Sequence, residues 1–356
     1  MIKAKLQKEK KNKEITLEEF MLVVQGHSAF QLLYAGVELK VFEVLNKNPD
    51  AFSYPALAKK IQLEKIPAKI LLDGLLTLKF ITRNEKTGFL KNSDISNEYL
   101  IAKSPVNWIG VLGWQKHIVY PAAIDFAESL RTNKNVGLRH FPGNGNTLYE
   151  RLVSNPGLEH VFQIAMQSLS DSANHYLIEH LNLKKFKHLL DFGGGNGTNA
   201  IRIIRKDSHL KVTILDMPSI CERAEKNILQ SKLGKKISTL PGNMFTTPLP
   251  KDIDCVLYSH IVTIWSPEKN IQLFKRIYDA LPSGGQIFVF STLGNDNGIG
   301  PVTTALGSVY FQTIATGEAM IYSGKEVGLF LKTAGFTSLK TIALPLDHTL
   351  CIGIKK

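Results

Sequence analysis

Apolar residues follow two different spacings along the chain. Between Thr16 and Leu45 they recur every three or four positions, as on helices that bury one face. From Lys187 onward, short apolar runs alternate with amphipathic segments, as in chains that form a parallel sheet covered by helices. The pattern predicts a mainly helical N-terminal part followed by an α/β domain. Two final runs, 339–344 and 349–354, predict a terminal antiparallel hairpin.

A compact unit of short elements follows the first helices. Its pattern predicts helices over residues 53–61 and 66–78 and a hairpin over residues 80–91. Two helices and a hairpin form a winged helix, a shape that often binds DNA. The second helix is rich in Leu and Ile and offers only Lys69 and Lys79 as cations, whereas base reading uses Arg, Asn or Gln. We therefore expect no nucleic-acid partner.

The stretch from residue 92 to residue 185 is predicted to be mainly helical and is rich in aromatic residues. Phe162, Ala165, Met166 and Leu169 recur on one face of its last helix. Such a face is either ordinary core or one wall of a ligand pocket, and the spacing alone does not separate the two.

Composition narrows the class of protein. The net charge of +12 comes from dispersed lysines, with one cluster in residues 3–13 that we interpret as part of a mobile, solvated arm over residues 1–15. No apolar run approaches the roughly 20 residues of a membrane span, and no signal-peptide core is present. The three cysteines form no metal-ligand cluster. We expect a globular, cytoplasmic protein with no metal site and no membrane partner.

The candidate ligand-binding residues cluster at the start of the α/β domain. A buried strand ends at Asp191 and Phe192 and runs into a turn of four glycines, Gly193, Gly194, Gly195 and Gly197, followed by an amphipathic helix. The next strand ends at Asp216, where an acid suits a pair of ribose hydroxyls. No Gly-Lys-Ser/Thr follows the glycines, so a ligand with a ribose but no phosphate fits better than a nucleotide phosphate.

Four stretches, in this order, resemble the motifs of S-adenosylmethionine-dependent methyltransferases. They cover residues 191–197, 215–218, 242–245 and 265–268. The nearer resemblance is to small-molecule O-methyltransferases with an N-terminal winged-helix dimerisation domain, and it covers nearly the whole chain. It implies a Rossmann-like doubly wound catalytic domain and a homodimer formed through the N-terminal domain. We expect dimerisation elements in 1–104, a helical connector and acceptor region in 105–185, and the cofactor-binding domain in 186–356.

The resemblance implies S-adenosyl-L-methionine as the cofactor. By position, Gly193 and Gly195 approach its methionine part and Asp216 takes its ribose hydroxyls. The expected neighbours of its adenosyl part are Met217, Asn243, Met244, Phe245 and Ser259. The family usually carries Asp where this chain has Asn243, but an amide oxygen can also accept a hydrogen bond from the adenine amino group.

The fourth motif departs from the family, whose His-Asp-Trp supplies a histidine general base. Here the residues are Thr263, Ile264 and Trp265, and threonine has no useful basicity near neutral pH. Among the other groups that remain open as the base, His260 lies closest in the chain, although it is also readable as a packed histidine. The rest are His117, His140 and Glu318. If none of these groups is the base, the acceptor is either acidic enough to ionise without one, or it is a nitrogen or carbon nucleophile, which has a different need for a base.

The resemblance and the aromatic middle region predict a small aromatic or polyketide-like acceptor. Phe162 and Met166 would form one wall of its pocket, with His117 and Trp265 as further contacts. We expect O-methylation in secondary metabolism. The alternatives are N- or C-methylation, a cofactor-binding enzyme that catalyses another reaction on the same scaffold, and a winged-helix regulator that senses the cofactor.

Overall fold

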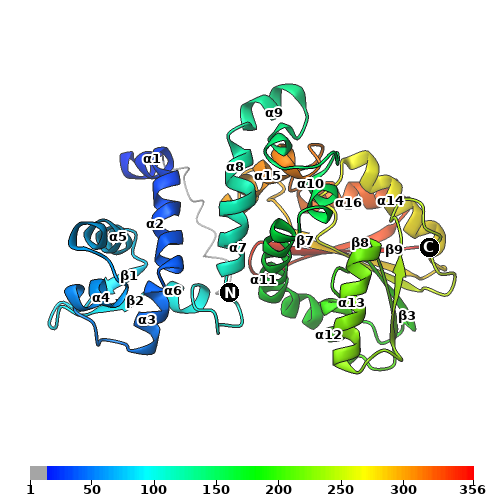
Figure 1. Ribbon diagram of the computed structural model, residues 1–356. Coiled ribbons are helices and arrows are strands. Elements are labelled where there is room, and N and C mark those ends of the chain that lie inside the picture. The colour runs from blue at the N-terminus through cyan, green and yellow to red at the C-terminus, as the bar shows by residue number, and fades with distance from the viewer. Residues whose placement is uncertain (1–13) are drawn as a thin grey trace, which may run out of the picture. The chain divides into compact units, whose positions relative to one another are not determined.

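A computed structural model describes residues 14–356 (Figure 1). The predicted arm lies almost entirely outside the described residues. Contacts divide the chain into two compact units, with the division between Leu112 and Gly113, inside helix α7.

The N-terminal unit contains the predicted helices and hairpin. Its elements are α1 (Leu17–Val24), α2 (Gly26–Glu38), α3 (Val41–Lys47), α4 (Tyr54–Lys60), α5 (Lys65–Thr77), β1 (Ile81–Arg83), β2 (Leu90–Asn92) and α6 (Asp94–Tyr99). β1 and β2 are antiparallel. Helices and hairpin share one apolar core, in which Phe42, Leu72 and Leu90 are almost completely buried. Asn92 Nδ2 donates to Phe42 O at 2.9 Å and ties the hairpin to α3.

Helix α1 begins with a capping box, in which Thr16 and Glu19 satisfy each other's backbone N–H groups. None of its residues is buried within the chain. Leu17 and Val23 are 75% and 76% exposed, and Phe20, Leu22 and Val24 are each about half exposed. In the described part of the chain no single helix is long and apolar enough to span a membrane. The bent pair α1–α2 meets that test by length and composition only.

The C-terminal unit starts with a helical region that precedes the sheet. Its elements, beginning with the helix that crosses the division, are α7 (Ile109–Trp114), the π-helical turn η1 (Gln115–Val119), α8 (Tyr120–Ala123), α9 (Phe126–Thr132), the 3₁₀ turn η2 (Val136–His140), α10 (Leu148–Val153) and α11 (Pro156–His180). The long helix α11 begins at Pro156, and Asn155 caps it by accepting from the backbone N–H of Leu158.

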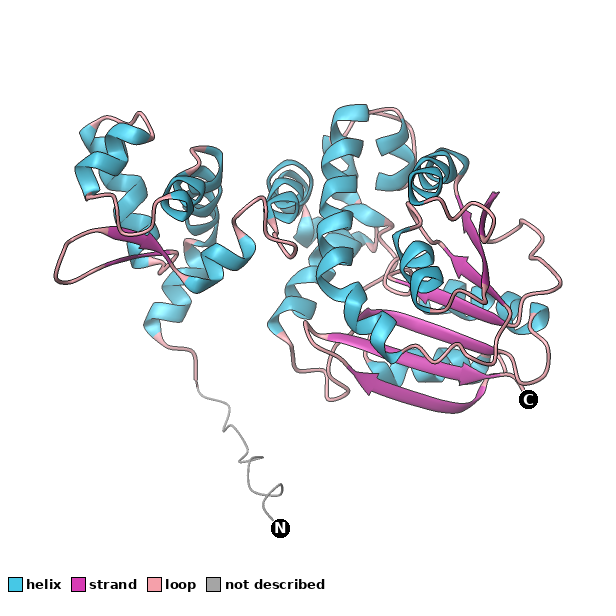
Figure 2. Ribbon diagram, turned by 90° about the horizontal axis from the view of Figure 1, so that it is seen from below, coloured by secondary structure: helices cyan, strands magenta, loops and turns pink. Residues whose placement is uncertain are grey.

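A seven-stranded sheet forms the centre of this unit, with strand order β5-β4-β3-β6-β7-β9-β8. Its strands are coloured magenta in Figure 2. The strands are β3 (His188–Phe192), β4 (Lys211–Asp216), β5 (Ile237–Pro241), β6 (Cys255–Ser259), β7 (Gln286–Thr292), β8 (Thr337–Ala343) and β9 (His348–Ile354). β3 to β7 are parallel, and β9 is antiparallel to both β7 and β8. The predicted doubly wound sheet and terminal hairpin are both present.

Helices cover both faces of this sheet. Besides α11, they are α12 (Thr198–Lys206), α13 (Pro218–Ser231), α14 (Pro267–Ala280) and α16 (Gly324–Thr333). The remaining helix α15 (Val302–Tyr310) continues into the π-helical turn η3 (Phe311–Ala315), which packs against the helical region of α8, α9, η2 and α10. α14 and α16 bury Phe274 and Leu331 in the core on one face. α11, α12 and α13 bury Leu177, Ile203 and Ile228 in the core on the other.

Strand order reverses between β3 and β6. From β3 the chain continues outward through β4 and β5, and it then returns to place β6 on the other side of β3. In open α/β sheets, ligands bind in the crevice at the carboxyl ends of the strands at such a switch point. We therefore expect a ligand site among the residues that follow β3, β4 and β6.

Candidate cofactor and acceptor site

The turn after β3 requires glycine for two separate reasons. Gly193, Gly195 and Gly197 have φ values of +74°, +58° and +81°, which L side chains rarely adopt. A Cβ atom on Gly193 would also lie 2.6 Å from Ile261 Cδ1. The turn is therefore both left-handed and closely packed against the loop that follows β6, and its backbone is left accessible to a ligand.

Asp216, at the end of β4, holds this turn in place. Its Oδ2 accepts from Gly195 N at 2.9 Å, and its Oδ1 accepts from Met217 N at 2.8 Å. Burial raises the pKa of the carboxyl, and the two backbone donors oppose that rise. Each oxygen keeps a lone pair, so the carboxylate can still accept from a vicinal diol. Met217 is 39% exposed beside it.

Asp191 lies beneath the same turn without a hydrogen-bond donor. Its side chain is completely buried, and neither carboxylate oxygen has a partner among the residues that the structure describes. Burial, together with the nearby Asp216, raises its pKa to about 7. An unpaired buried acid is unfavourable. A cationic ligand group above the turn would supply the missing partner.

Residues 242–245 form the next part of the crevice, after β5. Asn243 Oδ1 accepts from Phe245 N at 2.8 Å, and Asn243 N donates to Thr247 Oγ1 at 2.8 Å. The amide oxygen therefore already caps its own turn and has one lone pair left for a ligand. Met244 lies next to Gly193, and the ring of Phe245 packs edge-on against Trp265 with centroids 5.0 Å apart.

The segment after β6 forms the opposite side. Ser259 is buried and its Oγ accepts from Asn199 Nδ2 at 3.5 Å. His260 has a φ of +57°, and its ring packs edge-on against Phe290 and His348. Burial, together with His348, lowers the pKa of His260 to about 3. At neutral pH this imidazole is uncharged and is a weak proton acceptor.

Thr263 and Trp265 lie in a firmly anchored loop. Thr263 is only 4% exposed. Asn270 Nδ2 and the Tyr322 hydroxyl both donate to Trp265 O, at 2.8 and 2.9 Å. The indole Nε1 of Trp265 is buried with no partner in the described residues, and Lys269 Nζ lies 5.0 Å from the ring centroid. The loop thus presents a fixed aromatic surface and no strong base.

Helix α11 is fastened directly to the glycine turn. Asn196 Nδ2 donates to Gln167 Oε1 at 2.5 Å, and Arg202 pairs with Asp171 at 2.6 Å. Phe162 and Met166 are both partly buried and lie within the two turns that precede Gln167. An acceptor held along this helix would therefore be close to the cofactor turn.

The remaining candidate bases are placed differently. His117 is exposed in η1. His140 Nε2 lies 2.7 Å from Asp125 Oδ2, and Arg139 pairs with the same carboxylate. Glu318 accepts from Lys269 Nζ at 2.8 and 3.0 Å. The groups at His140 and Glu318 are thus already paired. Within residues 14–356 no cluster of three or more His, Cys, Asp or Glu side chains could hold a metal ion.

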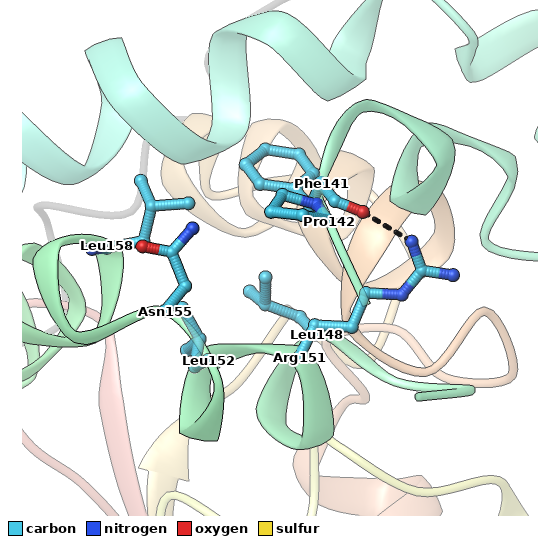
Figure 3. Close-up of a pocket in the computed structure, with 7 residues that line it drawn as sticks. All are labelled: Phe141, Pro142, Leu148, Arg151, Leu152, Asn155 and Leu158. Carbon is cyan, nitrogen blue, oxygen red and sulfur yellow. Dashed lines mark hydrogen bonds between the residues drawn. The ribbon is translucent and has the colours of Figure 1, made fainter. Parts of the chain in front are cut away.

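A small hollow lies between α10, η2 and the start of α11 (Figure 3). Its empty volume is about 150 Å³, below the roughly 300 Å³ of small-molecule pockets. Arg151 borders it, but its guanidinium donates to the carbonyls of Leu138, Phe141 and Gly145. We assign no ligand to this hollow.

Comparisons with known proteins establish the family. The family model of the O-methyltransferase domain matches residues 125–337, and that of the O-methyltransferase dimerisation domain matches residues 21–102. The L-tyrosine C(3)-methyltransferase of Streptomyces lavendulae is 36% identical over 90% of this chain and 87% of its own. The S-adenosylmethionine-dependent methyltransferase SibL has a TM-score of 0.84 and 35% identity, covering 96% of this chain and 99% of its own.

A third comparison concerns the fold. Human N-acetylserotonin methyltransferase in complex with S-adenosylmethionine has a TM-score of 0.83 at 23% identity, covering 97% of this chain and 99% of its own. The chain belongs to the O-methyltransferase family of S-adenosylmethionine-dependent methyltransferases. The predicted family, fold class, enzyme class and cofactor are therefore confirmed.

The residues of this chain fit that cofactor. S-adenosylmethionine carries an ammonium and a sulfonium, and the unpartnered carboxylate of Asp191 beneath the glycine turn suits a cation. It also carries a ribose and no phosphate, which agrees with Asp216 at the end of β4. The predicted role of each individual residue stays a prediction.

Proposed function

We propose that this enzyme methylates a small phenolic acceptor on a ring carbon next to the hydroxyl group. The observation that carries the proposal is the absence of a strong base after β6, where Thr263 stands and the pKa of His260 is lowered to about 3. The 36%-identical relative from Streptomyces lavendulae is an L-tyrosine C(3)-methyltransferase, and methylation at that ring position agrees with the proposal.

A phenol suits a site of this kind. Its hydroxyl ionises with a pKa near 10, and the resulting negative charge is shared with the neighbouring ring carbons. When bound, the cofactor supplies an electrophilic methyl group. The ring carbon forms the new C–C bond as the S–C bond breaks, and the ring proton is then lost to solvent. Phe162 and Met166 would hold the ring flat against α11, and Trp265 would exclude water.

O-methylation of the same acceptors is the second candidate. It is favoured by the match of residues 125–337 to the O-methyltransferase domain. The two candidates share the cofactor and the acceptor class and differ in which atom of the phenol attacks.

Product analysis separates these two functions. We expect incubation with S-adenosylmethionine carrying a ¹³C-methyl group and a para-substituted phenol, such as tyrosine, to give a product heavier by one labelled methyl. The label should appear in the NMR spectrum as an aryl methyl. A methoxy signal would replace our first candidate by the second, and no mass gain with any phenol would contradict both.

We also propose that the protein is a homodimer through its N-terminal domain. The match to the dimerisation domain over residues 21–102 and the exposed apolar surface of α1 support this. We expect light scattering at micromolar concentration to give twice the chain mass. Changing Leu17 and Val23 to Glu should shift the mass toward the monomer, whereas Glu18→Gln on the same helix should not. A monomeric wild-type protein would contradict the proposal.

A further inference from the structure

A group of hydrogen-bond donors lies next to Phe162 of α11, outside the cofactor motifs. The hydroxyl of Tyr310, on α15, donates to the hydroxyl of Tyr149, on α10, at 3.5 Å. Trp114 packs edge-on against Tyr310 with ring centroids 4.8 Å apart. Residues from α7, α10 and α15 therefore meet here, although they are far apart in the sequence.

These donors outnumber their acceptors. Trp114 is only 9% exposed, and its Nε1 has no partner in the described part of the chain. The Tyr149 hydroxyl accepts from Tyr310, and its own hydrogen has no acceptor within residues 14–356. The 3.5 Å separation of the two hydroxyl oxygens is well beyond the usual 2.7–2.8 Å or so of an O–H···O bond. A third oxygen could therefore approach both hydroxyls.

Both tyrosines should remain protonated, and so remain donors. Burial raises the pKa of Tyr149 to about 12. Burial, with Tyr149 beside it, also raises the pKa of Tyr310 well above its usual value. A neutral hydroxyl in an apolar setting stabilises a nearby oxygen anion more strongly than the same hydroxyl does in water.

The pair is also well placed for the reaction. The ring of Tyr149 packs edge-on against Phe162, with centroids 5.9 Å apart. Phe162 precedes Gln167 on α11 by a helical rise of about 7.5 Å, and Gln167 contacts Asn196 in the glycine turn. The tyrosine pair therefore lies beside the same helix that is fastened to the cofactor turn.

We propose that Tyr149, supported by Tyr310, donates a hydrogen bond to the phenolic oxygen of the acceptor and stabilises its ionised form. This inference rests on the proposed function, and it supplies what Thr263 lacks. The acceptor hydroxyl releases its proton to solvent, and the charge is shared with the ring carbon that attacks. The S–C bond breaks as the C–C bond forms, and a ring proton then leaves to restore aromaticity.

The test compares Tyr149→Phe and Tyr310→Phe with wild type, and uses Tyr278→Phe as a matched control on the far helix α14. We expect Tyr149→Phe to lower kcat/KM for a phenol about 10²-fold, as for loss of one oxyanion donor. The pH at which kcat/KM rises should move upward. The loss of kcat/KM in Tyr149→Phe should be smaller with fluorinated phenols, which ionise more readily. Tyr310→Phe should give a smaller change of the same kind, and Tyr278→Phe none.

Binding of S-adenosylhomocysteine to each variant, measured by calorimetry, separates this role from a structural one and should be unchanged. Equal loss with every phenol regardless of its acidity, or an unchanged pH profile, would overturn the inference. Failure of the wild-type enzyme to methylate any phenol would instead overturn the proposed function.

Discussion

Asp216→Ala should remove almost all affinity for S-adenosylhomocysteine. The carboxylate is expected to accept two ribose hydroxyls, and it also fixes the glycine turn through Gly195 N. Two hydrogen bonds to a charged acceptor are worth about 3–6 kcal/mol together, so the affinity should fall by roughly 10² to 10⁴-fold. Isothermal calorimetry on wild type and variant measures the change.

Two comparisons make that result specific. Asp216→Asn keeps the shape and one accepting oxygen and should lose less affinity than the alanine variant. Asp279→Asn, an exposed residue paired with Lys275 on α14, should bind as wild type does. Equal affinity in wild type and Asp216→Ala would exclude this carboxylate from the cofactor site.

Asp191 should make the stability of the ligand-free enzyme depend on pH. Burial, with Asp216 nearby, raises its folded pKa from the ordinary 3.8 to about 7. Between these two pH values the native state keeps the proton of Asp191, whereas the unfolded chain has lost it. The contribution of this proton to the free energy of unfolding is therefore fully present below about pH 4. It declines as the pH rises toward 7 and totals roughly 4 kcal/mol.

Urea unfolding of the ligand-free protein at pH 5 and pH 8 tests this linkage. Wild type should lose stability between the two values, and Asp191→Asn should lose about 2–3 kcal/mol less. The exposed-residue variant Asp279→Asn should follow wild type.

Bound cofactor supplies a cation, so affinity for S-adenosylhomocysteine should rise as the pH passes 7 in wild type only. Identical pH profiles for wild type and Asp191→Asn would refute the role of this carboxyl.

The fold was largely predictable from the chain because its elements have clear patterns. The helix of α14, for example, follows from Ser266 as cap and Pro267 at the first helical position, with Phe274 and Ile277 inward, and the structure has it there. β5 could not be predicted in the same way. It is an edge strand in which only Ile237 is buried, so it lacks an apolar run.

The helical segment of α15 and η3 was also absent from the prediction. It begins after a Gly- and Asn-rich loop, and Val302 and Leu306 are 73% and 69% exposed, so no clear inward face marks it. This segment carries Tyr310. The tyrosine pair could therefore not be predicted from the sequence, because only the tertiary packing of α10 and α15 brings Tyr149 and Tyr310 together.

The cofactor motifs were easier to predict than the chemistry. Motif residues near Gly193 and Asp216 are adjacent because successive parallel strands end at one edge, which the sequence pattern already implies. The properties of His260 depend instead on Phe290 and His348, which come from β7 and β9. Its lowered pKa is a consequence of that packing and has no local sequence signal.

A crystal structure with S-adenosylhomocysteine and a phenolic acceptor would test the central claim most directly. We predict the ribose on Asp216, the cofactor sulfur facing the side of α11 that carries Phe162 and Met166, and a ring carbon of the acceptor nearer to that sulfur than its hydroxyl oxygen. Side chains filling the crevice beside Gly193, or an acceptor bound away from α11, would contradict the account.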